Sequence, residues 1–186
     1  MTERTVRVVD LYHGDRVSSF AKAAAAGVWG VIHKATTGAT GRDEKYATRR
    51  ARVRAAGLLW GAYHWGTHAD VQKQIDNFLL IADPDEDTLV ALDFEETAGN
   101  QMTLAQARDF LGGVAEKIGR KPVLYSGHLI KDSLGGTVDP FFGGQPLARA
   151  VRRDARCSGE LGDILALAVH GQHEGPRAEH RSRSAW

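Results

Sequence analysis

Apolar and polar positions follow two alternating patterns along the first two thirds of the chain. Short runs rich in β-branched and aromatic residues, typical of buried strands, alternate with segments whose apolar residues have helical spacing. The predicted strands cover residues 5–12, 27–34, 58–65, 88–96 and 121–127. The predicted helices lie between them, at residues 18–27, 45–57, 69–82 and 102–119. This order favours right-handed strand–helix–strand units and an α/β fold with a parallel sheet.

A parallel sheet of this kind fits either a doubly wound fold or part of a (β/α) barrel. Both architectures place their active sites at the carboxyl ends of the strands. Polar side chains gather at these ends in the predicted sheet, namely Asp10 with His13, Lys34, Tyr63 with His64, Asp93 with Glu95, and Tyr125. We therefore expect the active site at the carboxyl-end edge of the sheet.

Composition narrows the classes of function only slightly. The chain has 186 residues, of which 42% are hydrophobic and 25% are charged, as expected for one globular domain. A formal net charge of +1 gives no overall field for nucleic acid or an anionic membrane. No stretch approaches the ~18 apolar residues of a membrane span, and no signal peptide is visible at the N-terminus. Cys157 is the single cysteine, which excludes an intrachain disulfide.

The stretch VALDFEE carries the most informative acids. Alternate residues of a strand share a face, so Asp93 and Glu95 should point the same way, while Phe94 and Glu96 face the opposite side. Two neighbouring acids raise each other's proton affinity. One can then remain protonated as a general acid while another carboxylate stabilises positive charge on a sugar. Asp10 would open onto the same mouth in a barrel, and a solvated or salt-bridged pair of acids is the alternative.

Aromatic side chains lie at the same strand ends, namely Tyr12, Tyr63, Trp65 and Tyr125. Sugar rings present apolar C–H faces, so aromatic walls with a few polar groups suit a saccharide cleft, although each ring alone can equally serve packing. His13, His33 and His64 match no metal-ligand motif, so no metal is expected.

Five sequence blocks occur in one order along the chain, namely DLYHG, VIHKATTG, AAGLLWGAYHW, LDFEE and LYSG. Together they resemble glycoside hydrolase family 25, the lysozymes (N-acetylmuramidases), over roughly residues 6–143. The resemblance implies an irregular (β/α) TIM-like barrel. It also implies cleavage of the bond between N-acetylmuramic acid and N-acetylglucosamine in peptidoglycan, without a metal or an organic cofactor.

The resemblance further implies roles for individual residues. Glu95 matches the general acid and base. Asp93 matches the partner acid that steers the acetamido group of the substrate in a substrate-assisted, retaining route. Asp10 matches the first-strand acid that completes the site. The predicted substrate-binding residues are Lys34, Tyr63, Trp65 and Tyr125.

Two departures from the family pattern stand out. Thr37 replaces an acid, which puts a secondary contact in doubt, and the end of the chain lacks the last strands of the family. A one-base shift of the reading frame over residues 145–152 and 159–172 can produce peptides that look like those strands; a divergent tail is the alternative. We predict a catalytic domain at residues 1–144, incomplete at its C-terminal strands, and an aberrant, disordered or frameshifted tail at residues 145–186.

Two other functions stay open. The first is an inactive remnant or glycan-binding module of the same fold. The second is nucleic-acid binding by the basic segments RRDAR and HRSRS, which lack an aromatic stacking pattern, so no nucleic-acid partner is expected. The expected partners are the glycan strands of peptidoglycan. A monomer acting on the cell wall without membrane contact is predicted, and the localisation of the chain stays open.

Overall fold

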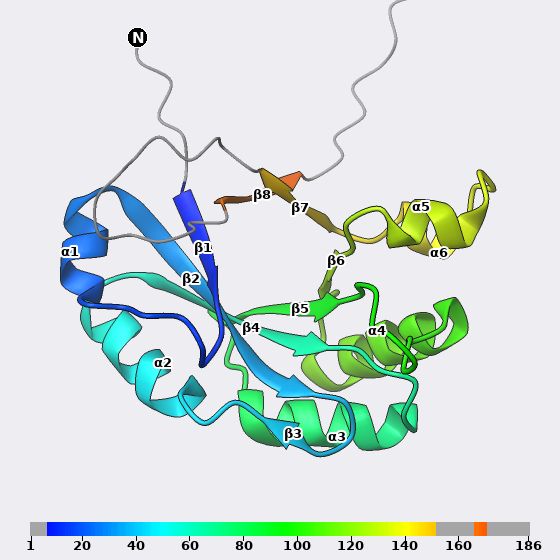
Figure 1. Cartoon of the computed structure of the whole chain (residues 1–186), viewed down its shortest axis with the longest axis horizontal. Helices are drawn as coiled ribbons and strands as arrows, with labels where there is room; N and C mark the ends of the chain where they lie inside the picture. Colours follow the sequence, from blue (N-terminus) through cyan, green and yellow to red (C-terminus); the bar gives the residue numbers. More distant parts are fainter. Residues whose placement is uncertain (1–6, 152–165, 171–186) are drawn as a thin grey trace, which may run out of the picture.

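The computed structural model describes residues 7–151 and 166–170. Within them, eight strands form one sheet (Figure 1): β1 (Arg7–Leu11), β2 (Val28–Thr37), β3 (Gly41–Arg42), β4 (Leu59–Trp65), β5 (Leu89–Asp93), β6 (Val123–Tyr125), β7 (Leu147–Val151) and β8 (Ala166–His170). The pairings β1–β2, β2–β4, β4–β5, β5–β6 and β6–β7 are parallel, and those of β2–β3, β7–β8 and β8–β1 are antiparallel. The predicted α/β class is confirmed as a mixed, mostly parallel sheet.

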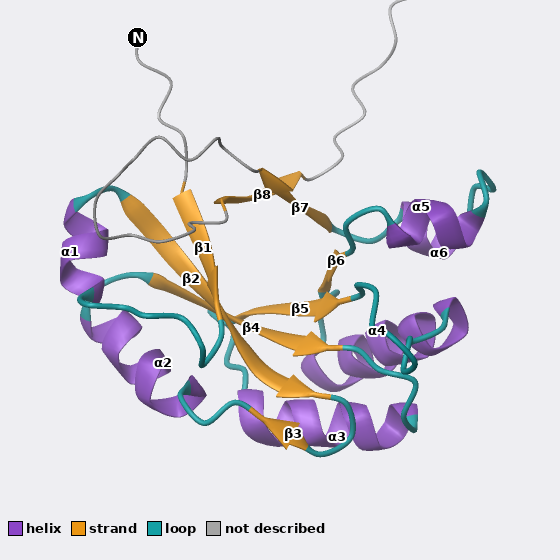
Figure 2. Ribbon diagram, in the orientation of Figure 1, coloured by secondary structure: helices purple, strands orange, loops and turns teal. Residues whose placement is uncertain are grey.

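The helices follow the strands along the chain: α1 (Phe20–Ala25), α2 (Tyr46–Ala55), α3 (Val71–Ala82), α4 (Leu104–Ile118), α5 (Leu129–Leu134) and α6 (Pro140–Gly143). Figure 2 shows α1 to α4 along one side of the sheet, with α5 and α6 beyond the end of β6. The four longer segments between the first five predicted strands are thus helical, as their spacing predicts.

Local hydrogen bonds explain where two of these helices begin. Ser19 caps α1, and its Oγ accepts a hydrogen bond from the N–H of Lys22 at 3.2 Å. Thr103 caps α4 in a reciprocal pair with Gln106, since each backbone N–H donates to the side-chain oxygen of the other residue. Both caps are serine or threonine, the residue types that favour a helix N-terminus, and both lie within the predicted helix ranges 18–27 and 102–119.

Two strand boundaries differ from the prediction. β5 ends at Asp93 instead of continuing to Glu96, and the N–H of Phe94 donates to the carbonyl of Tyr125 in the last residue pair between β5 and β6. β2 continues to Thr37, beyond the end of the strand predicted at residues 27–34, and forms a hairpin with β3.

The C-terminal segment contributes more strand than the sequence pattern predicts. Its apolar run ILALAV contains the start of β8, which lies between β7 and β1, and β7 extends the sheet from β6. Residues 152–165 and 171–186, most of the predicted tail, lie outside the described residues. The predicted boundary between residues 144 and 145 stays a prediction.

The two faces of the sheet bury different side chains. In β4, Trp60, Ala62 and His64 face the helices, whereas Tyr63 and Trp65 face the other side, as the two-residue period of a strand requires. The main core fills the space between the sheet and the helices. A smaller cluster on the inner face has Ile32, Tyr63, Ala91 and Val123 at its centre. The inner face also carries the predicted site.

Candidate active site

Asp93 is buried at the carboxyl end of β5. Its neighbours across the sheet are Trp65 of β4 and Tyr125 of β6. The side chain is 5% exposed, and its Oδ1 has no hydrogen-bond partner among the described residues. Burial first, and then the charges of Glu95 and Asp10, raise the pKa of Asp93 well above the ordinary value. This carboxyl therefore keeps its proton at pH values that ionise an exposed aspartate.

Asp10 lies on β1, in register with Ile32 of β2. Its Oδ1 is also buried without a partner in the described part of the chain. Burial and the nearby carboxylates of Asp15 and Glu95 raise its pKa from 3.8 to about 7, and the ammonium group of Lys34 opposes this shift. Asp10 can therefore gain or lose a proton near neutral pH.

Glu95 stands two residues beyond the end of β5. Phe94 between them is 1% exposed and packs in the main core, which confirms that it points away from Asp93. A β-carbon at Gly127 would stand 3.4 Å from Glu95 Oε1, an ordinary van der Waals contact, so the glycine after β6 lies directly beside this carboxylate. Burial and the charge of Glu95 raise the pKa of the neighbouring Tyr125 hydroxyl. Three acids from two strands thus lie close enough to influence one another.

Lys34 supplies the positive charge of the site. Its Nζ lies 4.8 Å from the ring centroid of Tyr12 and 5.5 Å from that of Trp65. The same ammonium group lowers the pKa values of Asp10 and Asp93 against the effect of burial. The cation is therefore placed between two aromatic rings and close to two acids.

Tyr63 is 8% exposed and lies in register with Lys34 of the adjacent strand. Burial, followed by the charges of Asp10 and Asp93, raises the pKa of its hydroxyl, so the group stays protonated. The structure brings together all the residues predicted for the site: Asp10, Lys34, Tyr63, Trp65, Asp93, Glu95 and Tyr125.

His64 does not join them, although the sequence pattern groups it with Tyr63. It faces the helices and stacks on Phe110 at 4.6 Å, because consecutive residues of a strand point to opposite faces. His13 lies in the loop after β1 with Nδ1 3.1 Å from Asp43 Oδ2. Among the described residues, no group of three His, Cys, Asp or Glu side chains is arranged to hold a metal ion.

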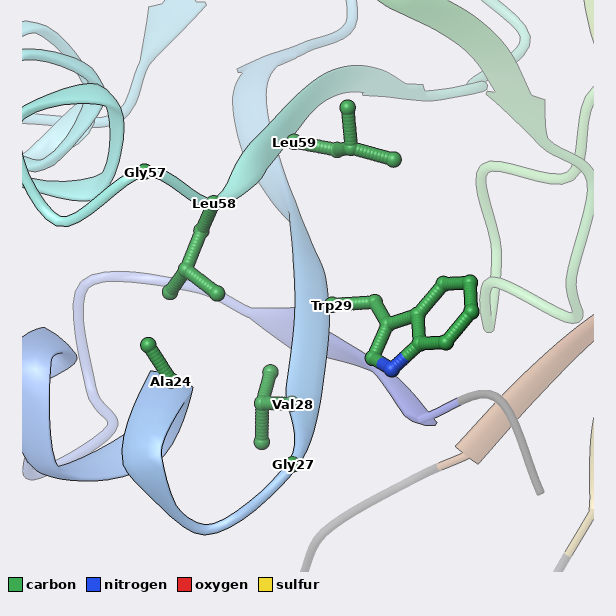
Figure 3. Close-up of a pocket in the computed structure, with 7 residues that line it drawn as sticks. All are labelled: Ala24, Gly27, Val28, Trp29, Gly57, Leu58 and Leu59. Carbon is green, nitrogen blue, oxygen red and sulfur yellow. The ribbon is translucent and has the colours of Figure 1, made fainter. Parts of the chain in front are cut away.

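A separate pocket of about 370 Å³ lies at the amino ends of β2 and β4 (Figure 3). It has no titratable lining residue: Ala24, Gly27, Val28, Trp29, Gly57, Leu58 and Leu59 surround it. The acids lie at the opposite ends of these strands, so this pocket is distinct from the candidate site.

Two residues lie beside the site through contacts that the sequence pattern does not predict, although one of them, Gly127, ends the LYSG block. Thr97 accepts a hydrogen bond from Nε1–H of Trp65 at 2.9 Å and so fixes the indole ring. Gly127 lies directly beside Glu95. Both act through contacts between residues about thirty positions apart, which no local pattern records.

The comparisons with known proteins identify the family of the chain. The model of the family described as glycosyl hydrolases family 25 matches residues 9–138. The match covers well over half of the chain, which therefore belongs to family 25 of the glycosyl hydrolases. The resemblance carried by the five sequence blocks is confirmed, and with it the prediction of a lysozyme-type glycosidase.

Solved structures of lysozymes and muramidases share the fold. The bacterial lysozyme from Streptomyces coelicolor matches with a TM-score of 0.68 at 22% identity, over 79% of this chain and 74% of that one. Muramidases from Trichobolus zukalii and Acremonium alcalophilum match with TM-scores of 0.70 and 0.72 at 24% and 21% identity, each over 90% of this chain and 95% of theirs. A search of curated proteins found no match. No helix in the described ranges has the length and apolar character needed to cross a membrane.

Proposed function

We propose that this glycosidase is a muramidase that cleaves the bond between N-acetylmuramic acid and N-acetylglucosamine in peptidoglycan. Membership of family 25 and the lysozyme fold support this assignment. The observation that carries it is the meeting of Asp10, Asp93 and Glu95 at the carboxyl ends of β1 and β5, where two carboxyl oxygens are buried without a partner among the described residues.

Glu95 serves as the general acid and base. It is half-buried and lies beside Gly127, so its carboxyl can reach a glycosidic oxygen, whereas Asp93 is nearly enclosed. Protonation of the leaving oxygen breaks the glycosidic bond, and the resulting carboxylate later removes a proton from the attacking water.

Asp93 orients the acetamido group of the substrate. Its unpartnered Oδ1 is an acceptor for the acetamido N–H, and this contact turns the acetamido oxygen toward the anomeric carbon. Asp10 stabilises the positive charge that develops there when its carboxyl is ionised. The result is a substrate-assisted cleavage with retention of configuration.

The aromatic residues and Lys34 form the substrate cleft. Trp65, Tyr63 and Tyr125 offer ring faces and hydroxyls to the sugar, and Lys34 presents its ammonium group to acceptor oxygens. Glycan strands of peptidoglycan are the substrate, and the chain acts as a monomer.

We further infer that the sheet forms an irregular (β/α) barrel, since β1 pairs with both β2 and β8. The catalytic unit covers residues 1–144. The segment at 145–186 arises from a change of reading frame near Gly144, and the coding DNA around this position tests that inference directly.

The central test is Glu95→Gln in the full chain, with Glu96→Gln as the matched control. An amide cannot donate the catalytic proton, so wall hydrolysis should fall by ~10²–10⁴ with an unchanged melting temperature. Glu96 is exposed, and its variant should clear bacterial walls at the parent rate. Activity of Glu95→Gln within a few-fold of the parent contradicts the role of Glu95. Binding to walls without any clearing by the parent would instead favour a glycan-binding remnant.

A further inference from the structure

The loop after β1 is held in place by a buried arginine from another part of the chain. Arg49 of α2 is 6% exposed. Its Nη1 donates to the carbonyl of Tyr12 at 2.6 Å, and its Nη2 donates to the carbonyl of Asp15 at 2.6 Å. One guanidinium group therefore fixes both ends of the segment Tyr12–Asp15.

Asp43 holds the middle of the same loop. Its Oδ2 accepts hydrogen bonds from the backbone N–H of His13 at 2.8 Å, and its Oδ1 accepts from the N–H of Lys45 at 3.0 Å. Within the loop, the N–H of Tyr12 donates to Oδ2 of Asp15 at 2.7 Å. The side chains of Arg49 and Asp43, together called the loop clamp below, thus bind the loop from α2 and from the segment before it.

His33 fixes the guanidinium group in turn. Its Nδ1–H donates to the carbonyl of Lys34 at 2.8 Å, since a carbonyl can only accept, and its Nε2 accepts from Arg49 at 2.9 Å. The imidazole is therefore neutral, in the Nδ1–H form. His33 therefore links the backbone carbonyl of Lys34, whose side chain is the cation of the site, to the guanidinium group of Arg49.

The loop carries one side chain into the candidate site. Tyr12 is 42% exposed, and its ring lies 4.8 Å from Nζ of Lys34. Neither Arg49 nor Asp43 has a hydrogen bond to the three acids among the described residues, so their hydrogen bonds reach the site through this loop and through His33.

We propose that Arg49 is a positioning residue for substrate binding, which acts by holding Tyr12 against Lys34 at the rim of the cleft. This inference rests on the proposed muramidase function. Without the clamp, the ring of Tyr12 loses its contact with Nζ of Lys34, and this wall of the cleft is no longer ordered. The acids keep their places on β1 and β5, so substrate binding weakens while the chemical step continues.

The test combines Arg49→Met, Arg49→Lys and Tyr12→Ala in the full chain with the control Arg52→Met. Arg52 lies on the same helix but is exposed and stacks only on Phe20 in the described contacts. With a soluble peptidoglycan tetrasaccharide as substrate, Arg49→Met should raise KM about tenfold and leave kcat within about threefold of the parent. Arg49→Lys keeps the charge but not the fork of donors and should give an intermediate KM.

A double-mutant cycle decides whether Arg49 acts through Tyr12. In the Tyr12→Ala background, Arg49→Met should cause no further rise in KM, because the ring that the arginine positions is already absent. Additive effects of the two substitutions, or a fall in kcat with unchanged KM, overturn the proposal. If Arg49→Met fails to fold, the same cycle is run with Arg49→Lys.

Hydrogen exchange gives a readout that does not depend on turnover. The amides of Tyr12 and His13 should exchange faster in the Arg49 variants than in Arg52→Met, while amides of β4 and β5 stay protected. If the exchange rates of the loop amides are unchanged in the Arg49 variants, the proposal that Arg49 holds the loop is wrong, even if the protein is inactive. Failure of the parent to clear walls, with faster loop exchange in the Arg49 variants, contradicts the muramidase function and leaves the clamp itself supported.

Discussion

On the helix-covered face of the sheet, the buried His64 has a partner for each ring nitrogen. On the inner face, Asp10 and Asp93 each bury a carboxyl oxygen that has no partner in the described part of the chain. Thr36 Oγ1 donates to Nδ1 of His64 at 2.7 Å, and Nε2–H donates to Gln74 Oε1 at 3.1 Å. Burial lowers the pKa of His64 to about 4, so the ring stays neutral. Buried polar groups are normally satisfied because an unmade hydrogen bond costs about 1–3 kcal/mol.

This difference in hydrogen bonding indicates that one face of the sheet serves the stability of the fold and the other serves catalysis. Side chains on the covered face are enclosed by helices and complete their hydrogen bonds within the chain. The acids of the inner face keep free acceptor atoms that a substrate can use. Substitutions on the first face should therefore change folding, and those on the second should change catalysis.

The largest effect on stability is expected for Phe110→Ala. Phe110 is fully buried between His64 and Phe78, and its loss leaves a cavity that should lower the free energy of unfolding by ~3–5 kcal/mol. Leu80→Ala, at an exposed position of α3, should change it by less than about 0.5 kcal/mol. Chemical denaturation measures both. A parent-like kcat of folded Phe110→Ala supports the separation of the faces, and a large loss of kcat argues against it.

Asp93→Asn should have the next largest effect, this time on turnover. The variant loses the carboxyl that orients the acetamido group of the substrate, so kcat should fall by ~10²–10³ with little change of KM. Asp109→Asn, on the exposed side of α4, serves as the control and should be neutral. Steady-state kinetics on a soluble peptidoglycan fragment separate the two parameters. A rise in KM alone would make Asp93 a binding residue.

Asp10→Asn should change how stability depends on pH. The pKa of Asp10 is raised from 3.8 to about 7 in the folded chain, so the folded state binds the proton more tightly than the unfolded state does. The parent should therefore lose about 2–3 kcal/mol of stability from this group as pH rises from 5 to 8. The asparagine variant lacks that loss. Denaturation curves at several pH values should show that the difference in unfolding free energy between the variant and the parent grows with pH. The buried histidines are common to both proteins and do not contribute to this difference. A difference that stays constant with pH would mean that Asp10 has an ordinary pKa.

Thr97→Val should have the smallest effect. Trp65 loses the acceptor for its indole N–H, worth ~0.5–1.5 kcal/mol, so KM should rise about two- to tenfold with unchanged kcat. Thr48→Val, at an exposed position of α2, controls for the change of side chain. Equal KM values for the two variants would show that the indole needs no support from Thr97.

Alternation along single strands was enough to predict the two faces. The pattern VALDFEE separates Phe94 from Asp93, and the structure buries Phe94 in the main core. The same rule, applied to Tyr63 and His64, would have separated them as well, since neighbours in a strand cannot share a face. The parallel sheet and the place of the candidate site at the carboxyl ends of its strands follow from the alternation of strands and helices. The order of the strands does not, because a doubly wound sheet fits the same alternation.

Contacts between distant segments could not be predicted in the same way. Arg49 belongs to a basic helix whose sequence gives no sign that this arginine is buried, because its acceptors lie on the loop after β1. The end of β5 at Asp93 coincides with its last residue pair with β6, Asp93 with Tyr125. Such features are set by tertiary structure and have no periodic signal.

The pairing of β1 with β8 has a consequence for the kinetics of folding. The parallel pairings from β1 to β7 join strands that are close in sequence, whereas Val9 and Ala166 bring together opposite ends of the described chain. Closing a longer loop costs more entropy, and contacts of large sequence separation slow folding. The β1–β8 contact should therefore form last. During synthesis, one edge of β1 stays unpaired until β8 has left the ribosome. A chaperone that covers this edge would have its greatest effect in that interval.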